Sequence, residues 1–467
     1  MSENLKVRNI RNEYRHSFIW NLVVLAAIVI AAIFIMPQSG PIGARTMLVL
    51  YMLDGGIMLM FMCILEKYTV TISGLYEKLV ISILSALYTF VIMGIFNLLF
   101  FTSRSKLIAD SIIAVAKVVA IFGVDFILHS IRNNENLYKK PKLLIIDSNT
   151  KNFFRMKRIK YGVLKNYDSW YENLEGISTG DLQMLAKSKF SEYDAICILD
   201  GLSDEEYHIV VSIASEMNKD LFIVPKMIDV GKTNARIARF DDVLTLYMPQ
   251  ISLTKLELSL KRILDIILSA IGLLVAIIPM AIIAVAIKLT SPGPVFYKQL
   301  RLTQNKKEFY IYKFRTMIPD AEKLSGPKFA EKDDPRITKI GKILRSCRLD
   351  ELPQIINILK GDMSIVGPRP ERPVFVEQFE KEISYYDYRF EVKAGLTSLS
   401  HVYGRYSTYI HDRTYYDLFY ITHYSLLLDL KIILLTTKTM FLKSAAEGED
   451  DYKEKTVAEA HTEVEIH

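Results

Sequence analysis

The stretch KRILDIILSAIGLLVAIIPMAIIAVAIK, residues 261–288, decides the fold that we predict for this chain. It contains an uncharged run, Ile266–Ile287, which is long enough to cross a hydrocarbon core of ~30 Å as a helix. Pro279 lies near the middle of this run, where it removes a backbone hydrogen bond and bends a helix. The pattern therefore predicts a helix that enters the membrane, bends at Pro279 and leaves on the side where it entered.

Charged residues at the ends of this run favour the same re-entrant arrangement. Lys261, Arg262 and Asp265 precede the run and Lys288 follows it. Basic side chains at both mouths suit a hairpin whose two ends lie at one leaflet, because anionic headgroups attract them. We assign residues 255–290 to a re-entrant helix hairpin, and a straight transmembrane span is the alternative.

Four apolar stretches of spanning length precede this helix, in a chain of 467 residues of which 51% are hydrophobic. They lie at about 17–36, 47–65, 79–101 and 108–130. No small-residue cleavage site follows the first stretch, which favours a retained anchor over a removed signal peptide. We therefore predict a four-helix transmembrane domain over residues 1–135 of a multi-pass membrane protein.

The basic residues around these stretches predict their orientation. The first loop offers only Arg45, whereas both outer ends of the domain are basic, with Lys6, Arg8, Arg11 and Arg15 before the first stretch and Arg132, Lys139, Lys140 and Lys142 after the fourth. The positive-inside rule then places both ends in the cytoplasm. Asp54 stands inside the second stretch, beside Gly55-Gly56, and is a candidate functional carboxylate whose partner the sequence does not reveal.

The segment 141–250 changes to short β-rich runs separated by helical stretches. The runs are Leu143–Asp147, Asp194–Leu199 and Leu221–Val224, and they predict a small Rossmann-like α/β module. Asp147–Lys151, after the first run, contains no glycine, so the fingerprint that lets a backbone approach a pyrophosphate is missing. We expect this module to be structural or regulatory, packing against a second copy in a homodimer, rather than to bind a dinucleotide.

The segment 291–445 begins with two basic strands. Residues 295–302 and 309–317 have strand patterns and are joined by a polar turn. Side chains alternate across a strand, so Gln299 and Arg301 share one face of the first strand and Lys313 and Arg315 share one face of the second. These faces are candidate phosphate sites, and simple exposed basic strands are the alternative.

The stretch RLDELPQ, residues 348–354, places two adjacent carboxylates at the mouth of a predicted helix. Pro353 fits the first helical turn, so Asp350 falls near the N-cap and Glu351 in the opening turn. Unpaired backbone N–H groups and the positive end of the helix dipole face the same spot, which favours a bound phosphate. The alternative is that Asp350 merely caps the helix.

The remaining features limit the classes of protein. Residues 424–441 are apolar but interrupted by charges such as Asp429, which suits a helix lying in the membrane interface. The acidic tail, 446–467, is expected to be disordered. The three cysteines lack CxxC or metal-ligand spacing, which argues against a disulfide framework or a zinc site. The formal net charge of +6 is modest, and the basic residues gather beside apolar segments. This pattern favours anionic lipids or phosphorylated substrates as binding partners over nucleic acid.

Taken together, these residues resemble the bacterial sugar transferase family, the monotopic polyprenyl-phosphate glycosyl-1-phosphate transferases. The resemblance runs from about Lys261 to Lys443 and rests on several motifs in order: Lys261-Arg262 with Asp265, Ser291-Pro292-Gly293-Pro294, Gln299 with Arg301, Lys313-Phe314-Arg315-Thr316-Met317, Asp334-Pro335-Arg336, LDELPQ at 349–354 and KGDMSIVGPRP at 360–370. The apolar stretches and the glycine-poor module are similar to the large form of the family, whose members start O-antigen and streptococcal capsule assembly.

The resemblance implies transfer of a sugar-1-phosphate from a UDP-sugar to undecaprenyl phosphate, with release of UMP, on the cytoplasmic face of the bacterial inner membrane. It implies Asp350 as the nucleophile of a covalent aspartyl intermediate and Mg²⁺ as the cofactor. We expect Asp350 and Glu351 to hold this Mg²⁺. For Asp429 the alternatives are support of the metal, support of a basic residue, and a solvated aspartate in the interface. The basic residues expected to bind substrate phosphates are Arg301, Lys313, Arg315, Arg345, Arg348 and Arg369.

Some positions depart from the family pattern. The late P-G-(I/L)-T-G motif appears as Ala394-Gly395-Leu396-Thr397-Ser398, and His401 stands where the family often has Gln. These departures concern contacts to the sugar and nucleotide more than the phosphoryl chemistry. Glucose is the sugar we expect, with galactose or an N-acetylated sugar as alternatives. A non-catalytic membrane scaffold or transporter subunit is the competing class, and a CDP-alcohol phosphotransferase is disfavoured because its spaced Asp motif is missing.

Overall fold

A computed structural model describes residues 10–35, 44–67, 75–100, 104–133, 142–147, 168–173, 179–198, 202–225, 230, 232–240, 243–248, 250–318, 336–404 and 410–441. The chain divides into two compact units, Met1–Lys226 and Met227–His467. The expected acidic tail, 446–467, lies outside the described residues. The sequence predicts five parts. Because the two units are a coarser division, the five-part division stays a prediction.

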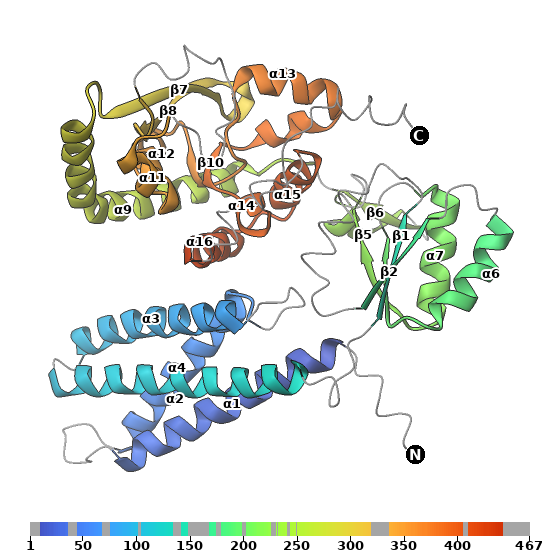
Figure 1. The fold of residues 1–467 in the computed structure, drawn as a ribbon, viewed down its shortest axis with the longest axis horizontal. Helices are drawn as coiled ribbons and strands as arrows, with labels where there is room; N and C mark the ends of the chain where they lie inside the picture. Colours follow the sequence, from blue (N-terminus) through green and yellow to red (C-terminus); the bar gives the residue numbers. More distant parts are fainter. Residues whose placement is uncertain are drawn as a thin grey trace. The chain divides into compact units, whose positions relative to one another are not determined.

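The first unit contains four helices at the positions of the predicted apolar stretches. They are α1 (Ile10–Ile35), α2 (Ala44–Ile64), α3 (Leu75–Phe100) and α4 (Arg104–Asn133). Helix α1 packs against α2 and α4, and α3 packs against the same two helices, so α2 and α4 lie across a diagonal of the bundle (Figure 1). Met58, Met62 and Ile121 are fully buried in its core.

Two of these helices are long and apolar enough to cross a membrane. The qualifying segments are Leu75–Asn97 in α3 and Asp110–Ile131 in α4, and a third qualifying helix, Lys255–Thr290, belongs to the second unit. Within the described residues, α1 and α2 contain only shorter apolar segments, Ser17–Ala31 and Val49–Ile64. The spanning of all four helices therefore stays a prediction.

A four-stranded parallel sheet in the order β2-β1-β3-β4 forms the rest of the first unit. Its strands and helices are β1 (Lys142–Asp147), β2 (Asp168–Asn173), α6 (Thr179–Phe190), β3 (Ala195–Ile198), α7 (Asp204–Glu216) and β4 (Asp220–Ile223). A parallel sheet with crossover helices is what a Rossmann-like module requires. Sequence patterns missed β2, because Asp and Asn at its ends are rare in strands.

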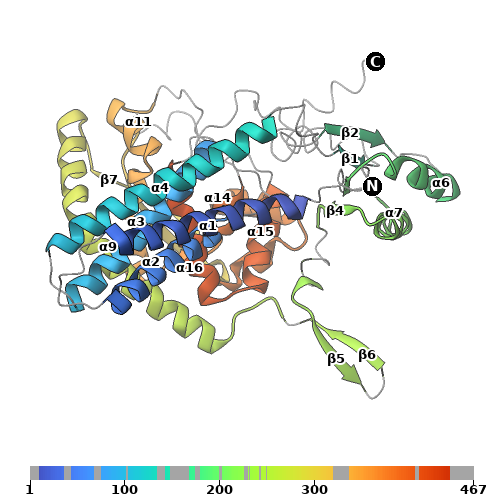
Figure 2. The same ribbon diagram turned by 90° about the horizontal axis from the view of Figure 1, so that it is seen from below.

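The second unit begins with a hairpin and a long helix. Strands β5 (Arg236–Phe240) and β6 (Val243–Tyr247) pair antiparallel (Figure 2). Helix α9 (Lys255–Thr290) is continuous over 36 residues with Pro279 inside it. The helix turns partway along its length, which is the shape that a re-entrant helix needs (Figure 1). Whether it re-enters or spans stays a prediction.

Three charged side chains near the start of α9 fasten it to the rest of the second unit. Lys261 forms an ion pair of 2.7 Å with Asp429, and both are buried. Arg262 donates to the carbonyl oxygens of Ile358 and Leu359, at 2.6 and 2.8 Å. The Lys261 and Arg262 side chains therefore bind protein groups, and the expectation that both ends of the helix lie at one leaflet stays a prediction.

The third of these residues, Asp265, holds the start of a strand. Its Oδ1 accepts from the Ser364 hydroxyl at 3.0 Å and from the Ile365 backbone N–H at 2.9 Å. Beyond it, most large apolar side chains of α9 are exposed, such as Leu274, Val275 and Ile278. The helix thus joins a polar, anchored beginning to a long apolar part. Ile283 and Ile287 of this part pack against Phe314 and Leu344, and its other large side chains are mostly exposed and suited to lipid.

The catalytic-motif residues lie on short strands and helices around this anchored end. These elements are β7 (Phe296–Leu302), η3 (Gln304–Lys306), β8 (Glu308–Phe314), α11 (Lys339–Ser346), η4 (Leu349–Glu351), α12 (Gln354–Lys360), β9 (Ser364–Val366), α13 (Pro373–Glu382), η5 (Tyr386–Glu391), β10 (Gly395–Thr397), α14 (Leu399–Tyr403), α15 (Ile410–Thr422) and α16 (Leu426–Phe441). Strands β7 and β8 pair antiparallel as predicted, and β9 pairs parallel to β10.

Two glycines allow β10 to approach the loop after β9. A Cβ atom on Gly395 would lie 2.2 Å from the backbone nitrogen of Gly367, and one on Gly367 would lie 2.3 Å from the carbonyl oxygen of Lys393. Such distances are impossible for any side chain, so both positions require glycine. This packing fixes the course of the chain into the Pro368-Arg369-Pro370 loop.

Helix α16 combines a buried and an exposed apolar side. Ile432 and Leu435 are fully buried, whereas Leu427 is 77% exposed and Phe441 is 59% exposed. The exposed apolar side suits a helix at a membrane interface, and that position stays a prediction.

Candidate active site

The two adjacent carboxylates lie in a 3₁₀ turn between α11 and α12. Asp350 and Glu351 belong to η4, and Arg348 before them adopts a left-handed backbone conformation with φ of 55°. Pro353 is the N-cap of α12 rather than a residue of its first turn. The predicted N-cap position of Asp350 is therefore wrong, because the tight turn between the two helices consumes residues 349–351.

Glu351 is held by two basic side chains. Its Oε1 accepts from Lys313 Nζ at 2.9 Å and from Arg369 Nη2 at 3.2 Å. Burial alone would raise the pKa of this carboxyl group, but the charges of Lys313 and Arg369 outweigh it and hold the pKa well below its usual range. Glu351 is therefore a fixed anion. Lys313 and Arg369, which we expect to bind substrate phosphates, contact this carboxylate, and their binding of a phosphate stays a prediction.

The pKa of Asp350 is shifted in the direction opposite to that of Glu351. Burial and, after it, the charge of Glu351 raise the pKa of this carboxyl group. Lys313 and Arg345 are close enough to lower that pKa in part, but no side-chain hydrogen bond to Asp350 exists among the residues that the structure describes. The adjacent carboxylates therefore differ: one is fixed by cations and the other keeps its oxygens for another partner.

The loop that carries Arg369 is held from both sides by guanidinium groups. Arg389 donates to the carbonyl oxygen of Arg369 at 2.8 Å and to Asp417 Oδ2 at 2.9 Å. Arg301 donates to the carbonyl oxygen of Pro370 at 3.0 Å. The Arg369 side chain itself is 41% exposed, so its guanidinium group is held in place yet accessible to a ligand.

Arg301 therefore braces the loop instead of facing a substrate. Its guanidinium group also donates to Gln299 Oε1 at 2.6 Å and lies 3.6 Å from Glu371. The sequence predicted the shared face of Gln299 and Arg301, but the residues bind one another there. This use of its donors argues against Arg301 as a phosphate ligand.

Arg315 and Arg345 also spend donors on protein atoms. Arg315 is buried and donates to the carbonyl oxygens of Ser291 and Pro292, which braces the turn after α9. Arg345 Nε donates to the Thr316 hydroxyl at 2.9 Å. The electrostatic effect of Arg345 on Asp350 shows that it lies near the carboxylates, whereas Arg315 serves the fold rather than a phosphate.

Asp429 does not join the carboxylate pair in a metal site. Its two oxygens bind Lys261 Nζ, at 2.7 Å, and the Tyr420 hydroxyl, at 2.6 Å. Among the described residues there is no cluster of three or more metal-ligating side chains. The prediction that Asp429 supports the metal is therefore wrong, because Lys261 and Tyr420 occupy it; its alternative, a basic partner, is confirmed.

The two remaining carboxylates still suit a hard cation that brings other ligands. Mg²⁺ is usually held by one or two carboxylates together with water and substrate phosphate oxygens. Asp350 and Glu351 repel one another, as the raised pKa of Asp350 records, and a divalent cation relieves such repulsion. The donor set therefore fits Mg²⁺ in the presence of a phosphorylated substrate.

His401 is a further residue near these charges. Burial, followed by the charges of Arg348 and Arg369, lowers the pKa of His401 to about 3, so the imidazole is neutral at physiological pH. Its backbone N–H is capped by the Ser398 hydroxyl at 3.0 Å, which fixes the start of α14. The sequence marked His401 only as a departure from the family pattern; Arg389 and Asp417 lie in no recognised motif and were missed.

Comparison with known proteins agrees with this arrangement. The sequence model of the family described as bacterial sugar transferase matches residues 256–443. A UDP-N-acetylgalactosamine-undecaprenyl-phosphate N-acetylgalactosaminephosphotransferase of Aeromonas hydrophila is 42% identical over 39% of this chain and 43% of its own length. A UDP-glucose:undecaprenyl-phosphate glucose-1-phosphate transferase of Escherichia coli is 33% identical over 57% of this chain and 59% of its own length.

The match to a shorter relative is nearly complete. The chain spans about half the length of the Aeromonas and Escherichia proteins, but it covers 94% of an exopolysaccharide production protein of Rhizobium leguminosarum at 39% identity. That coverage, together with the family match over the elements that carry Asp350, Glu351 and Arg369, leaves one assignment. The chain belongs to the bacterial sugar transferase family.

Proposed function

We propose that this protein transfers a sugar-1-phosphate from a UDP-sugar to undecaprenyl phosphate, as the first membrane step of capsule, exopolysaccharide or O-antigen synthesis. The observation that carries this proposal is the difference between the adjacent carboxylates. Glu351 is fixed by Lys313 and Arg369, while Asp350 has a raised pKa and no side-chain hydrogen bond among the described residues. Environments that push the pKa values of two neighbouring carboxyl groups apart indicate that the groups have separate roles in catalysis.

In the first half-reaction, a carboxylate oxygen of Asp350 attacks the β-phosphorus of the UDP-sugar. The bond from that phosphorus to the bridging oxygen breaks, UMP leaves with that oxygen, and an acyl-phosphate joins Asp350 to the sugar phosphate. In the second half-reaction, a phosphate oxygen of undecaprenyl phosphate attacks the same phosphorus and Asp350 leaves as a carboxylate. One site thus serves a soluble donor and then a membrane acceptor.

The surrounding charges favour phosphoryl transfer. One pyrophosphate bond is exchanged for another, so positioning and neutralisation of charge make up most of the catalysis. The guanidinium group of Arg369 is partly exposed and suited to two phosphate oxygens at once, and Lys313 and Arg345 lie close enough to influence the charge of Asp350. When bound by Asp350 and Glu351, Mg²⁺ would neutralise pyrophosphate oxygens.

UDP-glucose is the donor that we expect. The Escherichia relative named for glucose matches 57% of this chain, whereas the Aeromonas relative named for N-acetylgalactosamine matches 39%. The longer match extends beyond the family segment, but the identity of the second relative is higher, at 42% against 33%. We therefore propose glucose first and N-acetylgalactosamine or galactose as alternatives.

The proposal is tested with the purified full chain in lipid nanodiscs. A panel of UDP-sugars is supplied with undecaprenyl phosphate and Mg²⁺, and UMP release is measured. Acid quenching without the acceptor, followed by peptide mass spectrometry, should locate one sugar-phosphate on the peptide that contains Asp350. The matched control is Asp387→Asn, because Asp387 forms an exposed ion pair with Lys306 and lies outside the carboxylate pair.

Asp387→Asn should keep wild-type turnover, while Asp350→Asn should form no adduct. An adduct on any other residue would move the nucleophile, and wild-type turnover by Asp350→Asn would show that the covalent mechanism through Asp350 is wrong. Absence of UMP release with every UDP-sugar would favour the scaffold alternative.

A further inference from the structure

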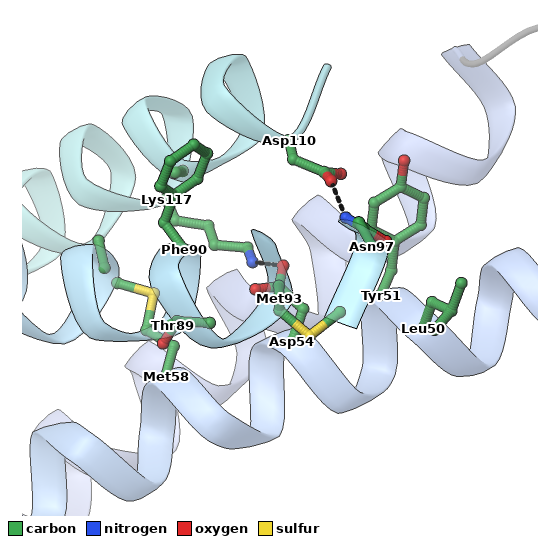
Figure 3. A pocket seen from close by; sticks show the side chains of 12 residues that line it. Leu50, Tyr51, Asp54, Met58, Thr89, Phe90, Met93, Asn97, Asp110 and Lys117 are labelled. Atoms are coloured by element: carbon green, nitrogen blue, oxygen red, sulfur yellow. Dashed lines mark hydrogen bonds and ion pairs between the residues drawn. The ribbon is translucent and has the colours of Figure 1, made fainter. Parts of the chain in front are cut away.

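A small polar cavity lies inside the α1–α4 bundle, in the half of the chain that the family match does not cover. Its volume is about 20 Å³. It is lined by side chains of α2, α3 and α4, namely Leu50, Tyr51, Asp54, Met58, Ala86, Thr89, Phe90, Met93, Asn97, Asp110, Ala114 and Lys117 (Figure 3). A polar cavity above roughly 10–15 Å³ is large enough for one water molecule.

Two polar contacts cross this cavity between helices. Lys117 of α4 forms an ion pair with Asp54 of α2, the partner that the sequence did not reveal (Figure 3). Asn97 Nδ2 of α3 donates to Asp110 Oδ2 of α4 at 2.6 Å. Charged and amide groups are therefore concentrated at one place in an otherwise apolar bundle, where each costs free energy unless its hydrogen bonds are satisfied.

One polar atom of this group remains unsatisfied. Asn97 is 5% exposed, and its Oδ1 has no hydrogen-bond donor in the described part of the chain. Rotating the amide does not help, because it would place the oxygen against the Asp110 carboxylate and lose the existing bond. Thr89, another lining residue, spends its hydroxyl proton on the carbonyl oxygen of Ser85 at 2.8 Å, so it has none for Asn97.

We propose that the cavity binds a single water molecule that donates to Asn97 Oδ1 and accepts from Lys117. The Lys117 ammonium carries three protons and needs only one for Asp54, so it supplies a donor to the water. Such a water has the two to four polar partners that buried waters usually make.

Water fits this cavity better than a metal cation. A sodium ion would be attracted to Asp54 and Asn97 Oδ1, but the Lys117 ammonium lines the same cavity and repels it. An apolar occupant would leave Asn97 Oδ1 unsatisfied. The bound water thus completes a polar connection between α3 and α4 and keeps a hydrated ion pair inside the helix bundle.

Two methionines of the bundle provide an internal comparison for the test. Met58 and Met62 are both fully buried on α2, but only Met58 lines the cavity. X-ray radiolysis converts water to hydroxyl radicals that oxidise side chains beside it, so a bound water labels a buried methionine that bulk radicals cannot reach. The full chain in nanodiscs is irradiated for milliseconds in H₂¹⁸O, and oxidation of each methionine is read by mass spectrometry.

The proposal expects Met58 to be oxidised several-fold faster than Met62, with ¹⁸O in the product. Asn97→Leu, which removes the unsatisfied oxygen and fills space, should lower the Met58 rate to that of Met62 while Met62 stays unchanged. Equal slow rates for the two methionines in the wild-type chain would show a dry cavity and overturn the proposal.

Replacing sodium by choline separates water from a bound ion. The ratio of Met58 to Met62 oxidation should stay unchanged under this exchange. A ratio that rises when sodium is removed would mean that the ion occupied the site, which would also overturn the proposal. The wild-type measurement decides the question even where Asn97→Leu fails to fold.

Discussion

The helix bundle of the first unit and the candidate active site of the second unit both bury charged side chains, but the charges are paired differently in the two regions. In the bundle, Lys67 pairs with Asp125 at 2.7 Å with both side chains fully buried, and Lys117 pairs with Asp54. Each cation there meets one anion. Around Glu351, by contrast, two cations share one carboxylate, while Asp350 forms no ion pair with any residue in the described part of the chain. Complete pairing indicates a structural role, and incomplete pairing indicates a site that awaits charged ligands.

The two ion pairs between the α2 side and the α4 side of the bundle have opposite polarity. The α2 side carries Asp54 and then Lys67 just beyond the helix, while α4 carries Lys117 and then Asp125. A parallel arrangement of α2 and α4 matches opposite charges, whereas the reverse direction would place like charges together. The alternation therefore selects one direction and one register of the helices, much as buried polar residues do in coiled coils.

The largest effect should come from Asp350→Asn. Loss of the proposed nucleophile should reduce transfer by at least ~10⁴-fold, measured as UMP release. The melting temperature should stay the same or rise, because the neutral amide removes repulsion from Glu351. A large fall in melting temperature would show that Asp350 is a structural residue, like the paired charges of the bundle.

The next effect is on stability and concerns the beginning of α9. Lys261→Met leaves Asp429 buried without its cation and should lower the free energy of unfolding by about 3–5 kcal/mol. Denaturation of the full chain in nanodiscs measures it. The double variant Lys261→Met, Asp429→Asn should recover much of the loss, because no buried charge remains. A double variant no more stable than the single one would mean that Lys261 acts by packing alone.

A smaller loss is expected in the bundle. Lys117→Met strands Asp54 inside the helices and should cost about 2.5–3.5 kcal/mol, the range for a charge within a membrane helix. The charge exchange Asp54→Lys, Lys117→Asp keeps one pair and should restore most of the stability. Restored stability would show that the bundle needs an ion pair here and not a particular residue at each position. An exchange variant as unstable as Lys117→Met would contradict this argument.

The support of Arg369 gives a kinetic prediction. Arg389→Lys keeps a positive charge beside Asp417 but loses the forked donors that hold the carbonyl oxygen of Arg369. Misplacement of Arg369 should reduce kcat/KM by up to ~10²-fold, with a raised KM for the UDP-sugar. Arg236→Lys, at an exposed position on β5, should leave both constants unchanged. Equal loss in kcat with unchanged KM would argue against positioning of the donor.

The sequence predicted the elements whose patterns are local. The strands at residues 296–302 and 308–314 and the helix carrying Pro279 follow from periodicity and length. Partners far apart in the sequence could not be predicted in this way, since Lys117 and Asp54 are separated by 63 residues and Lys261 and Asp429 by 168. For this reason the sequence identified charged residues correctly but often misjudged what they bind.

The same distinction explains the candidate site. Asp350, Glu351, Lys313 and Arg369 were singled out because short motifs carry them, but the sequence did not show that Lys313 and Arg369 pair with Glu351. Arg301 and Arg315 are in equally recognisable motifs, yet they brace backbone carbonyl oxygens. A guanidinium group suits a phosphate and a carbonyl oxygen equally well, so only the fold decides between the two uses.

The smallest expected effect is a shift in a pH profile. Burial and the charge of Glu351 raise the pKa of Asp350, so its reactive anion should be lost at a higher pH than for an ordinary aspartate as the pH falls. Glu351→Gln removes the repelling charge and leaves Lys313 nearby. The pKa of Asp350 should then fall, and the acid limb of the residual activity should move to lower pH.

The first half-reaction is the right measurement, because a single turnover of UMP release without undecaprenyl phosphate excludes titration of the acceptor. His401, with its pKa lowered to about 3 by burial and nearby arginines, does not titrate in this range. Asp417 does, since burial raises its pKa to about 6 despite Arg389, so Asp417→Asn is the matched control. If the acid limb moves in Asp417→Asn and stays in place in Glu351→Gln, the titrating group is Asp417, which supports the Arg369 loop. The different environments of Asp350 and Glu351 would then not explain the pH dependence of the reaction.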